Sequence, residues 1–531
     1  MTSSRRQFIK KTALASSALA LGPYFVFGQA QPATLMKRDM GRLGFEATTL
    51  GLGGQASLQW TPEGVDAVKI ILKAFDLGVN YFDTANVYGP SQAYYGNAFR
   101  ELNLIPGVPG YNERLRRSIF LTSKTFIRFG RGAAAKPAFA KAPAGKPDAA
   151  KVPAGKPDAA KVPAGKPDAA KVPSPKPPQL VTDDIRRSLS QIFGDGSGSY
   201  PQGAYLDMML VHGIGMAGGM TDVDNVFEGY EKTDSKADNI GVLATLIDFR
   251  DGSNLTGLNP REERLIRHIG FSGHAGSDTM IEMIHRDTRG VLDGMLVTIN
   301  ANDRRYFSMQ TNVIPVAAAN NMGIIAMKVF ADGAMYEKDA MFTSRADQVI
   351  RTVGSAEVPS RRLIEYVMTN PHIHTAVIGI GHIDDNQAAC QLRQNIAAAQ
   401  IAPNGLSETD RRDIEKLAGT IKNGNTNYFQ AAASPLGAPR NPVVARQTGS
   451  TGNIARLTWQ TAFAGDEPIA RYEIMRDGLK VGEVAHRPQV TAAPFSFEDA
   501  ISDQSKRNYR IVAVDAVGRT AQTDELLLES A

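Results

Sequence analysis

Short apolar runs alternate with longer amphipathic stretches along most of the chain. The stretch Pro62–Leu77 is an example of the second kind, because Val65, Val68 and Leu72 fall on one helical face and Gly78 follows as a stop signal. The apolar runs are short, and several of them end at a glycine or at a charged residue. Strand and helix in regular alternation predict a parallel sheet with helices outside it.

The same pattern gives the bounds of the expected elements. We expect a hairpin over Leu35–Leu50 and helices over Ser91–Leu102, from Thr182, from Asp384 to Ala399 and over Ser407–Ile421. The predicted strands are, in chain order, Thr48–Gly54, Asn80–Asp83, Ser118–Lys124, Tyr205–His212, Arg267–Ser272, Met295–Asn300, Gly323–Phe330 and Thr375–Gly379.

Residues 126–180 interrupt the alternation. This segment contains the repeat Ala-Gly-Lys-Pro-Asp-Ala-Ala-Lys-Val-Pro, which runs in tandem from Ala144 to Pro173. Its prolines oppose helix and sheet, and it has too few large apolar side chains to offset the entropy of ordering. We therefore predict a disordered or polyproline-like basic arm inserted after Lys124. A neutral expansion in a tolerant loop is the simpler interpretation, and a binding role is the alternative.

The C-terminal part of the chain has a different pattern. Residues 426–442 are rich in Asn, Ala and Pro and predict a linker, and residues 443–531 alternate polar and apolar positions as strands do. Trp459, Tyr472 and Tyr509 resemble the core aromatic positions of fibronectin type III domains, so we expect an all-β sandwich of that kind. Its strands carry no group of catalytic residues, and its expected partner is an envelope polysaccharide or protein.

The N-terminus reads as an export signal. Arg5 and Arg6 precede Phe8 and Lys10, and a modest apolar stretch then ends near Ala30. This is the pattern of a Tat signal peptide over residues 1–30, and it predicts a periplasmic or envelope-associated protein. The apolar stretch is too short and not hydrophobic enough for a stable membrane anchor.

The composition of the chain argues against several kinds of binding site. The chain has 531 residues, and its net charge of +5 owes much to the lysine-rich repeat, so charge gives no argument for nucleic-acid binding. The single cysteine, Cys390, excludes an internal disulfide and a cysteine-held iron–sulfur cluster. The 8 histidines show no paired metal-ligand spacing, so no metal site is predicted.

Polar residues at three successive strand ends carry the candidate chemistry. Asp83 ends one apolar run and is followed by Tyr88, Lys124 ends the next, and His212 ends the third. The pieces Phe-Asp-Thr-Ala-x-x-Tyr-Gly, Thr-Ser-Lys-Thr and Asp-x-x-x-x-His resemble the motifs of the aldo/keto reductase family. The resemblance implies a (β/α)8 TIM barrel over residues 35–425, with these four residues as the catalytic tetrad.

The implied chemistry is hydride addition to a carbonyl. Tyr88 would donate the proton to the carbonyl oxygen, while His212 would bind and orient that oxygen. Lys124 would lower the pKa of Tyr88, and Asp83 would hold Lys124 in place. The nicotinamide cofactor carries the hydride in this family.

The resemblance also implies a set of cofactor-binding residues. They are Gly53 and Gly54 in the loop after the first strand, Ser272 after the fifth, and Gly379, Gly381, His382 and Arg393 in the region of the adenosine phosphate. The chain departs from the family at Gly273 and Leu296, where Asn and Gln would hold the carboxamide, and it has Met327 where an aromatic ring is common.

The expected activity is therefore NADP(H)-dependent interconversion of a small aldehyde, ketone or sugar-type carbonyl with an alcohol, with NAD(H) left open as the cofactor. The alternative is a barrel that keeps the cofactor site but serves as a non-catalytic binding or sensing module in the envelope. The intact tetrad favours the enzyme, and the missing carboxamide contacts favour the module.

Overall fold

The computed structural model describes residues 34–125, 177–215, 223–230, 240–449, 452–501 and 503–530. The predicted signal peptide and the repeats of the inserted arm lie outside the described residues. The chain divides into two units, Met1–Leu35 and Met36–Ala531, and the described helices and strands all belong to the second.

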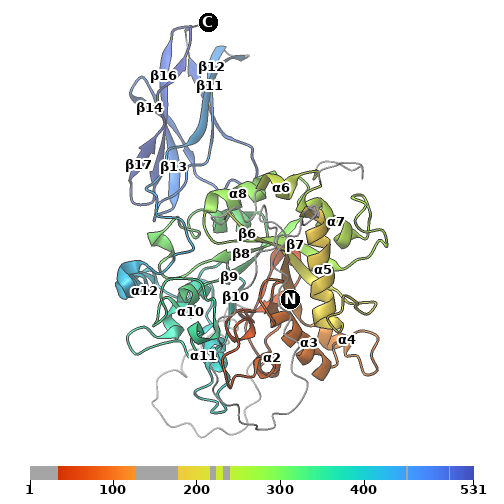
Figure 1. Cartoon of the computed structure of the whole chain (residues 1–531). Helices are drawn as coiled ribbons and strands as arrows, with labels where there is room; N and C mark the ends of the chain where they lie inside the picture. The colour runs from red at the N-terminus through yellow and green to blue at the C-terminus, as the bar shows by residue number, and fades with distance from the viewer. Residues whose placement is uncertain are drawn as a thin grey trace, which may run out of the picture. The chain divides into compact units, whose positions relative to one another are not determined.

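Parallel strands form a closed barrel (Figure 1). Neighbours along the chain pair with one another, and the last strand pairs with the first through Ala376 opposite Leu50. Every residue of six of these strands is buried. Closure confirms the predicted TIM barrel. The strands are β3 (Leu50–Leu52), β4 (Tyr81–Asp83), β5 (Phe120–Thr125), β6 (Leu206–Ile214), β7 (Ile266–Gly273), β8 (Leu292–Thr298), β9 (Gly323–Met327) and β10 (Thr375–Ile378).

A hairpin precedes the barrel, as the sequence predicts. Its strands β1 (Lys37–Asp39) and β2 (Glu46–Thr48) are antiparallel. Met40 and Leu43 from its turn are buried in one cluster with barrel residues such as Tyr81 and Phe120. The hairpin therefore fills one end of the barrel interior with apolar side chains, which leaves the other end for polar groups.

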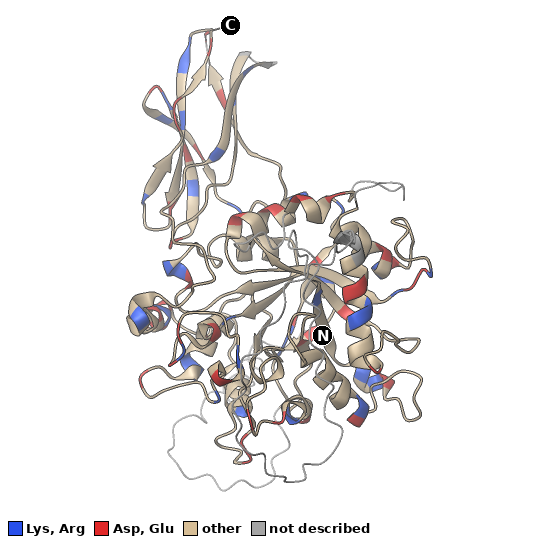
Figure 2. Ribbon diagram, viewed as in Figure 1, with Lys and Arg blue, Asp and Glu red and all other residues tan. Residues whose placement is uncertain are grey.

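Helices surround the strands (Figure 1). On these outer helices Lys and Arg lie close to Asp and Glu (Figure 2), and several make pairs four residues apart, such as Arg117 with Glu113 and Arg412 with Glu408. The helices are α2 (Ala67–Asp76), α3 (Ser91–Glu101), α4 (Glu113–Arg117), α5 (Pro177–Phe193), α6 (Val223–Phe227), α7 (Val242–Asp251), α8 (Ser277–Arg286), α9 (Val313–Ala319), α10 (Ser360–Met368), α11 (Gln391–Ala398) and α12 (Glu408–Thr420).

Two predicted helix starts are wrong. Helix α5 begins at Pro177 rather than Thr182, because proline is well suited to a first helical turn. Helix α11 begins at Gln391 rather than Asp384. Residues after Asp384 instead form successive turns in which Asp384 and Asn386 side chains accept hydrogen bonds from backbone N–H groups two residues on. These turns resemble a helix cap in sequence.

Residues 426–432, the first part of the predicted linker, pack against the barrel. Thr426 and Asn427 have no exposed surface, and Asn427 exchanges two hydrogen bonds with Asn300, each 3.1 Å long. Gln430 donates to the carboxylate of Asp303 at 2.8 Å. A polar sequence thus forms a buried hydrogen-bonded network here.

The C-terminal part is all-β. One antiparallel sheet contains β11 (Arg440–Gly449), β12 (Gly452–Gln460) and β15 (Phe495–Ile501), and the other contains β13 (Ile469–Arg476), β14 (Leu479–Ala485), β16 (Arg507–Asp515), β17 (Thr520–Gln522) and β18 (Leu526–Leu528). Trp459, Tyr472 and Tyr509 share one buried core drawn from both sheets. An all-β sandwich is therefore confirmed, while its fibronectin type III character stays a prediction.

No helix in the described ranges is long and apolar enough to cross a membrane.

Candidate functional site

The four tetrad residues come together at one end of the barrel. Asp83 ends β4, Lys124 lies near the end of β5, His212 lies in β6, and Tyr88 follows β4 by five residues. Parallel pairing places Asp83 beside Thr122 and Lys124 beside Leu210, so the strands bring the side chains to the same level. All four residues are buried, with at most 7% of their surface exposed.

Asp83 and Lys124 form a buried ion pair. The Lys124 Nζ lies 2.6 Å from each Asp83 carboxylate oxygen and donates its third hydrogen bond to the Thr84 carbonyl at 2.9 Å. The backbone N–H of Gly54 also donates to Asp83. Burial raises the pKa of Asp83 and lowers that of Lys124, while each partner's charge opposes the shift of the other. With this geometry the pair stays ionised.

Tyr88 lies against this pair in a way that the sequence did not predict. The Lys124 Nζ is 4.6 Å from the centroid of the Tyr88 ring, and its three N–H groups are already used by Asp83 and Thr84. Burial, then the carboxylates of Asp83 and Asp332, raise the pKa of Tyr88 well above its usual value. Burial thus outweighs the lowering of this pKa that was expected from Lys124, and Tyr88 is a protonated phenol with a cation at its ring face.

His212 lies next to Tyr88. The two ring centroids are 5.8 Å apart, with the rings edge to face. Burial lowers the pKa of His212 well below 6.5, and the cation of Lys124 adds to the effect. The imidazole is therefore neutral at physiological pH, which lets one nitrogen donate a hydrogen bond and the other accept one.

A second layer of polar side chains holds the loop that carries Tyr88. Asn86 donates to the backbone carbonyl of Lys124 at 3.1 Å and to the Ser188 hydroxyl on α5 at 3.1 Å. Gln92 on α3 donates to Ser123 and Ser188 at 3.1 and 2.9 Å. The loop is thus tied to β5 and to two helices, which fixes the position of the phenol relative to Lys124.

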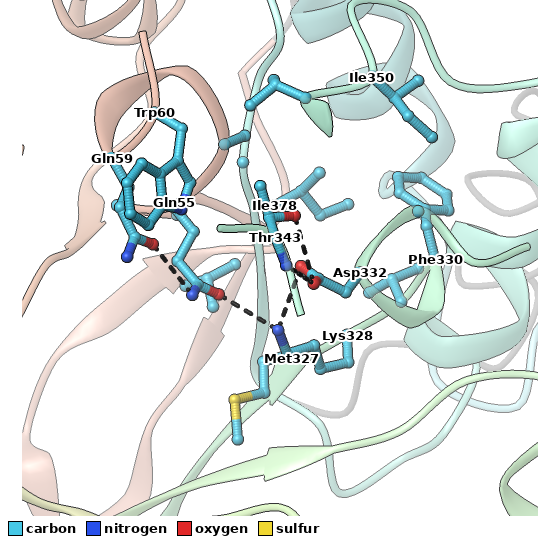
Figure 3. A pocket seen from close by; sticks show the side chains of 18 of the residues that line it. Gln55, Gln59, Trp60, Met327, Lys328, Phe330, Asp332, Thr343, Ile350 and Ile378 are labelled. Carbon is cyan, nitrogen blue, oxygen red and sulfur yellow. Dashed lines mark hydrogen bonds and ion pairs between the residues drawn. The ribbon is translucent and has the colours of Figure 1, made fainter. Parts of the chain in front are cut away.

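Asp83 and Tyr88 help to line an open pocket of about 900 Å³, a volume that includes solvent at its mouth. Gly53, Gly54, Gly379, Leu296 and Met327 also line it, and Figure 3 shows part of the lining. A row of polar contacts crosses its middle: Gln59 accepts from Gln55, and Gln55 in turn accepts from Lys328, which pairs with Asp332 (Figure 3). Its farther part is lined by the segment from Thr343 to Val353.

Other predicted cofactor residues do not line this pocket. Ser272 is fully buried, and its hydroxyl accepts a hydrogen bond from the Gly213 backbone at 3.0 Å. Gly381 packs against the backbone of Ile350 and Arg351, where a Cβ would not fit. His382 contacts the Arg351 carbonyl, and Arg393 donates to Gln387, both on the exposed surface.

Sequence reasoning missed three pocket residues. Lys328 and Asp332 lie just after β9, and Trp60 lines the pocket with a buried indole N–H that has no hydrogen-bond partner among the described residues. A cation following an apolar strand is the signal that identified Lys124, and Lys328 carries the same signal after Met327. No group of three metal-ligating residues occurs in the part of the chain that the structure describes.

Comparisons with known proteins agree with this site. The aldo/keto reductase family model matches residues 49–215, a range that includes the whole tetrad. A protein of Schizosaccharomyces pombe, provisionally described as a voltage-gated potassium channel subunit beta, is 37% identical over 107 residues, which are 19% of this chain and 27% of that protein. The chain thus matches about a quarter of that relative's length.

Two solved structures are also similar. One, provisionally described as an aldo-keto reductase of Pseudomonas aeruginosa, is 20% identical, with 68% of this chain and 96% of that chain covered and a TM-score of 0.36. The other is the holo form of the aldo-keto reductase AKR11C1 of Bacillus halodurans, 16% identical, with 72% and 96% covered and a TM-score of 0.39. The barrel itself rests on the strand pairing of this chain. The family model thus identifies an aldo/keto reductase domain, a domain of oxidoreductases, at residues 49–215.

Proposed function

We propose that this protein interconverts a small carbonyl compound and the corresponding alcohol with a nicotinamide dinucleotide as hydride carrier. The observation that carries the proposal is the buried Asp83–Lys124 pair beneath a protonated Tyr88 at the end of an open pocket. Aldehydes, ketones and sugar-type carbonyls are the substrate class. NADP(H) and NAD(H) are both candidates, because Lys328 is the one cation among the described residues that line the pocket and it already pairs with Asp332.

The pocket residues fit such a cofactor. Leu296 and Met327 line the pocket together with Tyr88, and their apolar side chains suit a nicotinamide ring. Lys328, whose side chain is 5% exposed, is the cation among the described residues that line the pocket. An apolar lining that includes one cation suits the flat ring and the anionic phosphates of a dinucleotide.

Each tetrad residue has a role in the reaction. When bound, the nicotinamide supplies the hydride. Tyr88 donates its phenolic proton to the oxygen that gains negative charge, and its raised pKa keeps that proton in place until the alkoxide forms. Lys124, 4.6 Å from the ring, stabilises the phenolate that results, and Asp83 holds Lys124 there. Neutral His212 donates a hydrogen bond that orients the carbonyl oxygen.

The sequence supports a location outside the cytoplasm. The twin arginines Arg5 and Arg6 match a Tat signal, and Tat exports folded proteins, so the enzyme would bind its cofactor before export. The sandwich over residues 443–531 would then contact an envelope polysaccharide or protein. Both statements rest on sequence alone.

Titration of the purified protein with NADPH and NADH tests the proposal. We expect the fluorescence of the reduced nicotinamide to change on binding, and we expect a generic aldehyde to oxidise the bound cofactor. Binding without turnover over a broad panel of carbonyls would favour the non-catalytic module. Absence of binding by either dinucleotide would contradict the proposed function altogether.

A further inference from the structure

The barrel contains a buried histidine that the proposed mechanism does not use. His274 directly follows β7, and β7 pairs with β6, the strand that carries His212. Parallel pairing places Gly273 opposite Ile214, so each histidine lies within two residues of one paired position. Adjacent strands in a sheet are ~4.8 Å apart. The two histidines therefore come from the same end of neighbouring strands.

His274 has an unused hydrogen-bonding group in the folded chain. Its surface is 6% exposed, close to the 7% of His212. Its backbone carbonyl accepts a hydrogen bond from Thr298 at 3.3 Å, and its ring packs edge to face on Phe429 with the centroids 6.4 Å apart. The ring Nδ1 is buried and has no hydrogen-bond partner among the described residues. Such an atom costs free energy, which points to a partner that arrives with a ligand.

The charges around His274 are those of the reaction site. Burial lowers the pKa of His274 to about 3, and the cations of Lys328 and Lys124 add to the effect while Asp332 opposes it. The same two cations lower the pKa of His212, and so does His274. The two imidazoles therefore lie near one another and near the tetrad lysine, and both are neutral at physiological pH.

A hydroxyl group fits this environment better than an anion does. The Asp83 carboxylate already pairs with Lys124 at 2.6 Å. Asp332 pairs in the same way with Lys328 at 3.3 Å. The site therefore has no need of a further negative charge beside His274. A neutral imidazole donates one hydrogen bond and accepts another, and a hydroxyl can match either nitrogen.

We propose that His274 determines substrate specificity by binding a hydroxyl on a carbon next to the carbonyl, while His212 binds the carbonyl oxygen. This inference rests on the proposed function, and it narrows the substrate class to hydroxyaldehydes and hydroxyketones. Side chains from two adjacent strands can reach two oxygens of one small molecule. A substrate without the hydroxyl leaves a buried ring nitrogen unpaired and is disfavoured for that reason.

The test compares aldehydes that differ only in their hydroxyl groups, namely glyceraldehyde with propanal and glycolaldehyde with acetaldehyde. The measured quantity is kcat/KM at saturating NADPH or NADH, whichever binds, referred to the free, unhydrated aldehyde. The parent should favour the hydroxyaldehyde of each pair by about tenfold or more. His274→Phe keeps a ring against Phe429 and should lose this preference, while its kcat/KM for propanal stays within about threefold of the parent's.

Two further variants act as controls. Gln has a donor and an acceptor, so His274→Gln should keep part of the preference. His268 lies on the same strand, but its ring stacks on Phe120 of the apolar cluster at 6.0 Å, and its Nδ1 lies 3.0 Å from the Asp293 carboxylate. His268→Phe should therefore keep the parental preference.

Two results would overturn the inference. One is a parent with equal kcat/KM for both members of each pair, which needs no variant. The other is a fall in His274→Phe that is equal for hydroxyaldehyde and deoxy partner, because His274 would then act on the cofactor or through His212. If the parent binds neither dinucleotide, the proposed function fails and this inference fails with it. If the parent reduces propanal but shows no preference, only this inference is wrong.

Discussion

The chain contains two tryptophans, and they lie in regions that use burial differently. Trp459 is fully buried in the sandwich core, where it stacks on Phe495 at 5.9 Å and meets Tyr472 at 5.5 Å. Trp60 is only partly buried and lines the barrel pocket. At both positions the indole N–H has no hydrogen-bond partner within the described part of the chain. In the sandwich this atom lies in the packed core, whereas in the barrel it belongs to a side chain that lines the pocket.

The ionisable groups repeat this difference. In the sandwich, Tyr509 donates to Asp499 at 2.7 Å, and Arg476 pairs with the same carboxylate, so the buried charge is matched locally. In the barrel, Lys124 donates all three of its hydrogen bonds to Asp83 and to the Thr84 carbonyl. Tyr88 lies next to Lys124 and lines the pocket. A polar network whose members bond only to one another stabilises the fold. A network that places one titratable group in a pocket can also take part in catalysis.

The largest expected effect comes from Lys124→Met. Turnover should fall by about 10² or more, because the phenolate of Tyr88 loses its neighbouring cation. The variant should also lose about 3–5 kcal/mol of unfolding free energy, because Asp83 becomes an unpaired buried charge. Steady-state rates and chemical denaturation measure the two losses.

The double variant Asp83→Asn/Lys124→Met separates them. It should regain most of the stability, because neither buried charge remains, while turnover stays low. Recovery of turnover together with stability would mean that the pair has only a structural role.

The sandwich counterpart is Trp459→Ala. Removing this fully buried ring should cost about 3–5 kcal/mol of unfolding free energy, as large-to-small changes in a core do. The rate per folded molecule should not change, since Trp459 touches no pocket residue that the structure describes. A drop in the specific rate at a temperature where the protein is fully folded would show that the two regions are not separable in function.

A smaller effect distinguishes the tryptophans by fluorescence. In Trp459→Phe, the remaining Trp60 should be quenched when a reduced dinucleotide binds, because it lines the pocket. In Trp60→Phe, the remaining Trp459 should change much less. Equal quenching in the two variants would place the dinucleotide elsewhere.

The smallest expected effect is the change of stability with pH, which should have the same direction in the barrel and in the sandwich. Burial lowers the pKa of His274 in the barrel to about 3 and that of His486 in the sandwich to about 4. The unfolded chain binds these protons near pH 6.5 and the folded chain does not, so stability should fall as the pH drops below 6.5. The pH profile of kcat/KM for the folded enzyme should show no titration near pH 6.5, because His212 is also neutral there. Melting temperatures and kcat/KM between pH 5 and 8 check both statements.

The alternation of strands and helices predicted a parallel sheet, and the resemblance of the segments at Asp83, Lys124 and His212 to aldo/keto reductase motifs predicted that the sheet is a closed barrel, which the strand pairing confirms. The sequence did not predict the orientation of Lys124 toward the Tyr88 ring, which depends on how the Thr84 carbonyl and Asp83 share its donors. Nor could it show that Asn427 and Tyr428 belong to the barrel, because buried amide networks have no hydrophobic periodicity and their polar sequence is typical of a linker. His382 and Arg393 do not line the pocket, and their predicted contact with the adenosine phosphate stays a prediction.

The central claim is that Tyr88 is the proton donor, and Tyr88→Phe tests it most directly. The measurement is NADPH or NADH affinity beside the steady-state rate with a carbonyl that the parent reduces. The ring remains and most of the pocket is formed by other residues, so the dissociation constant should stay within about threefold of the parent's, while kcat falls by about 10² or more. A variant that binds the dinucleotide normally and reduces the carbonyl at the parental rate would contradict the account.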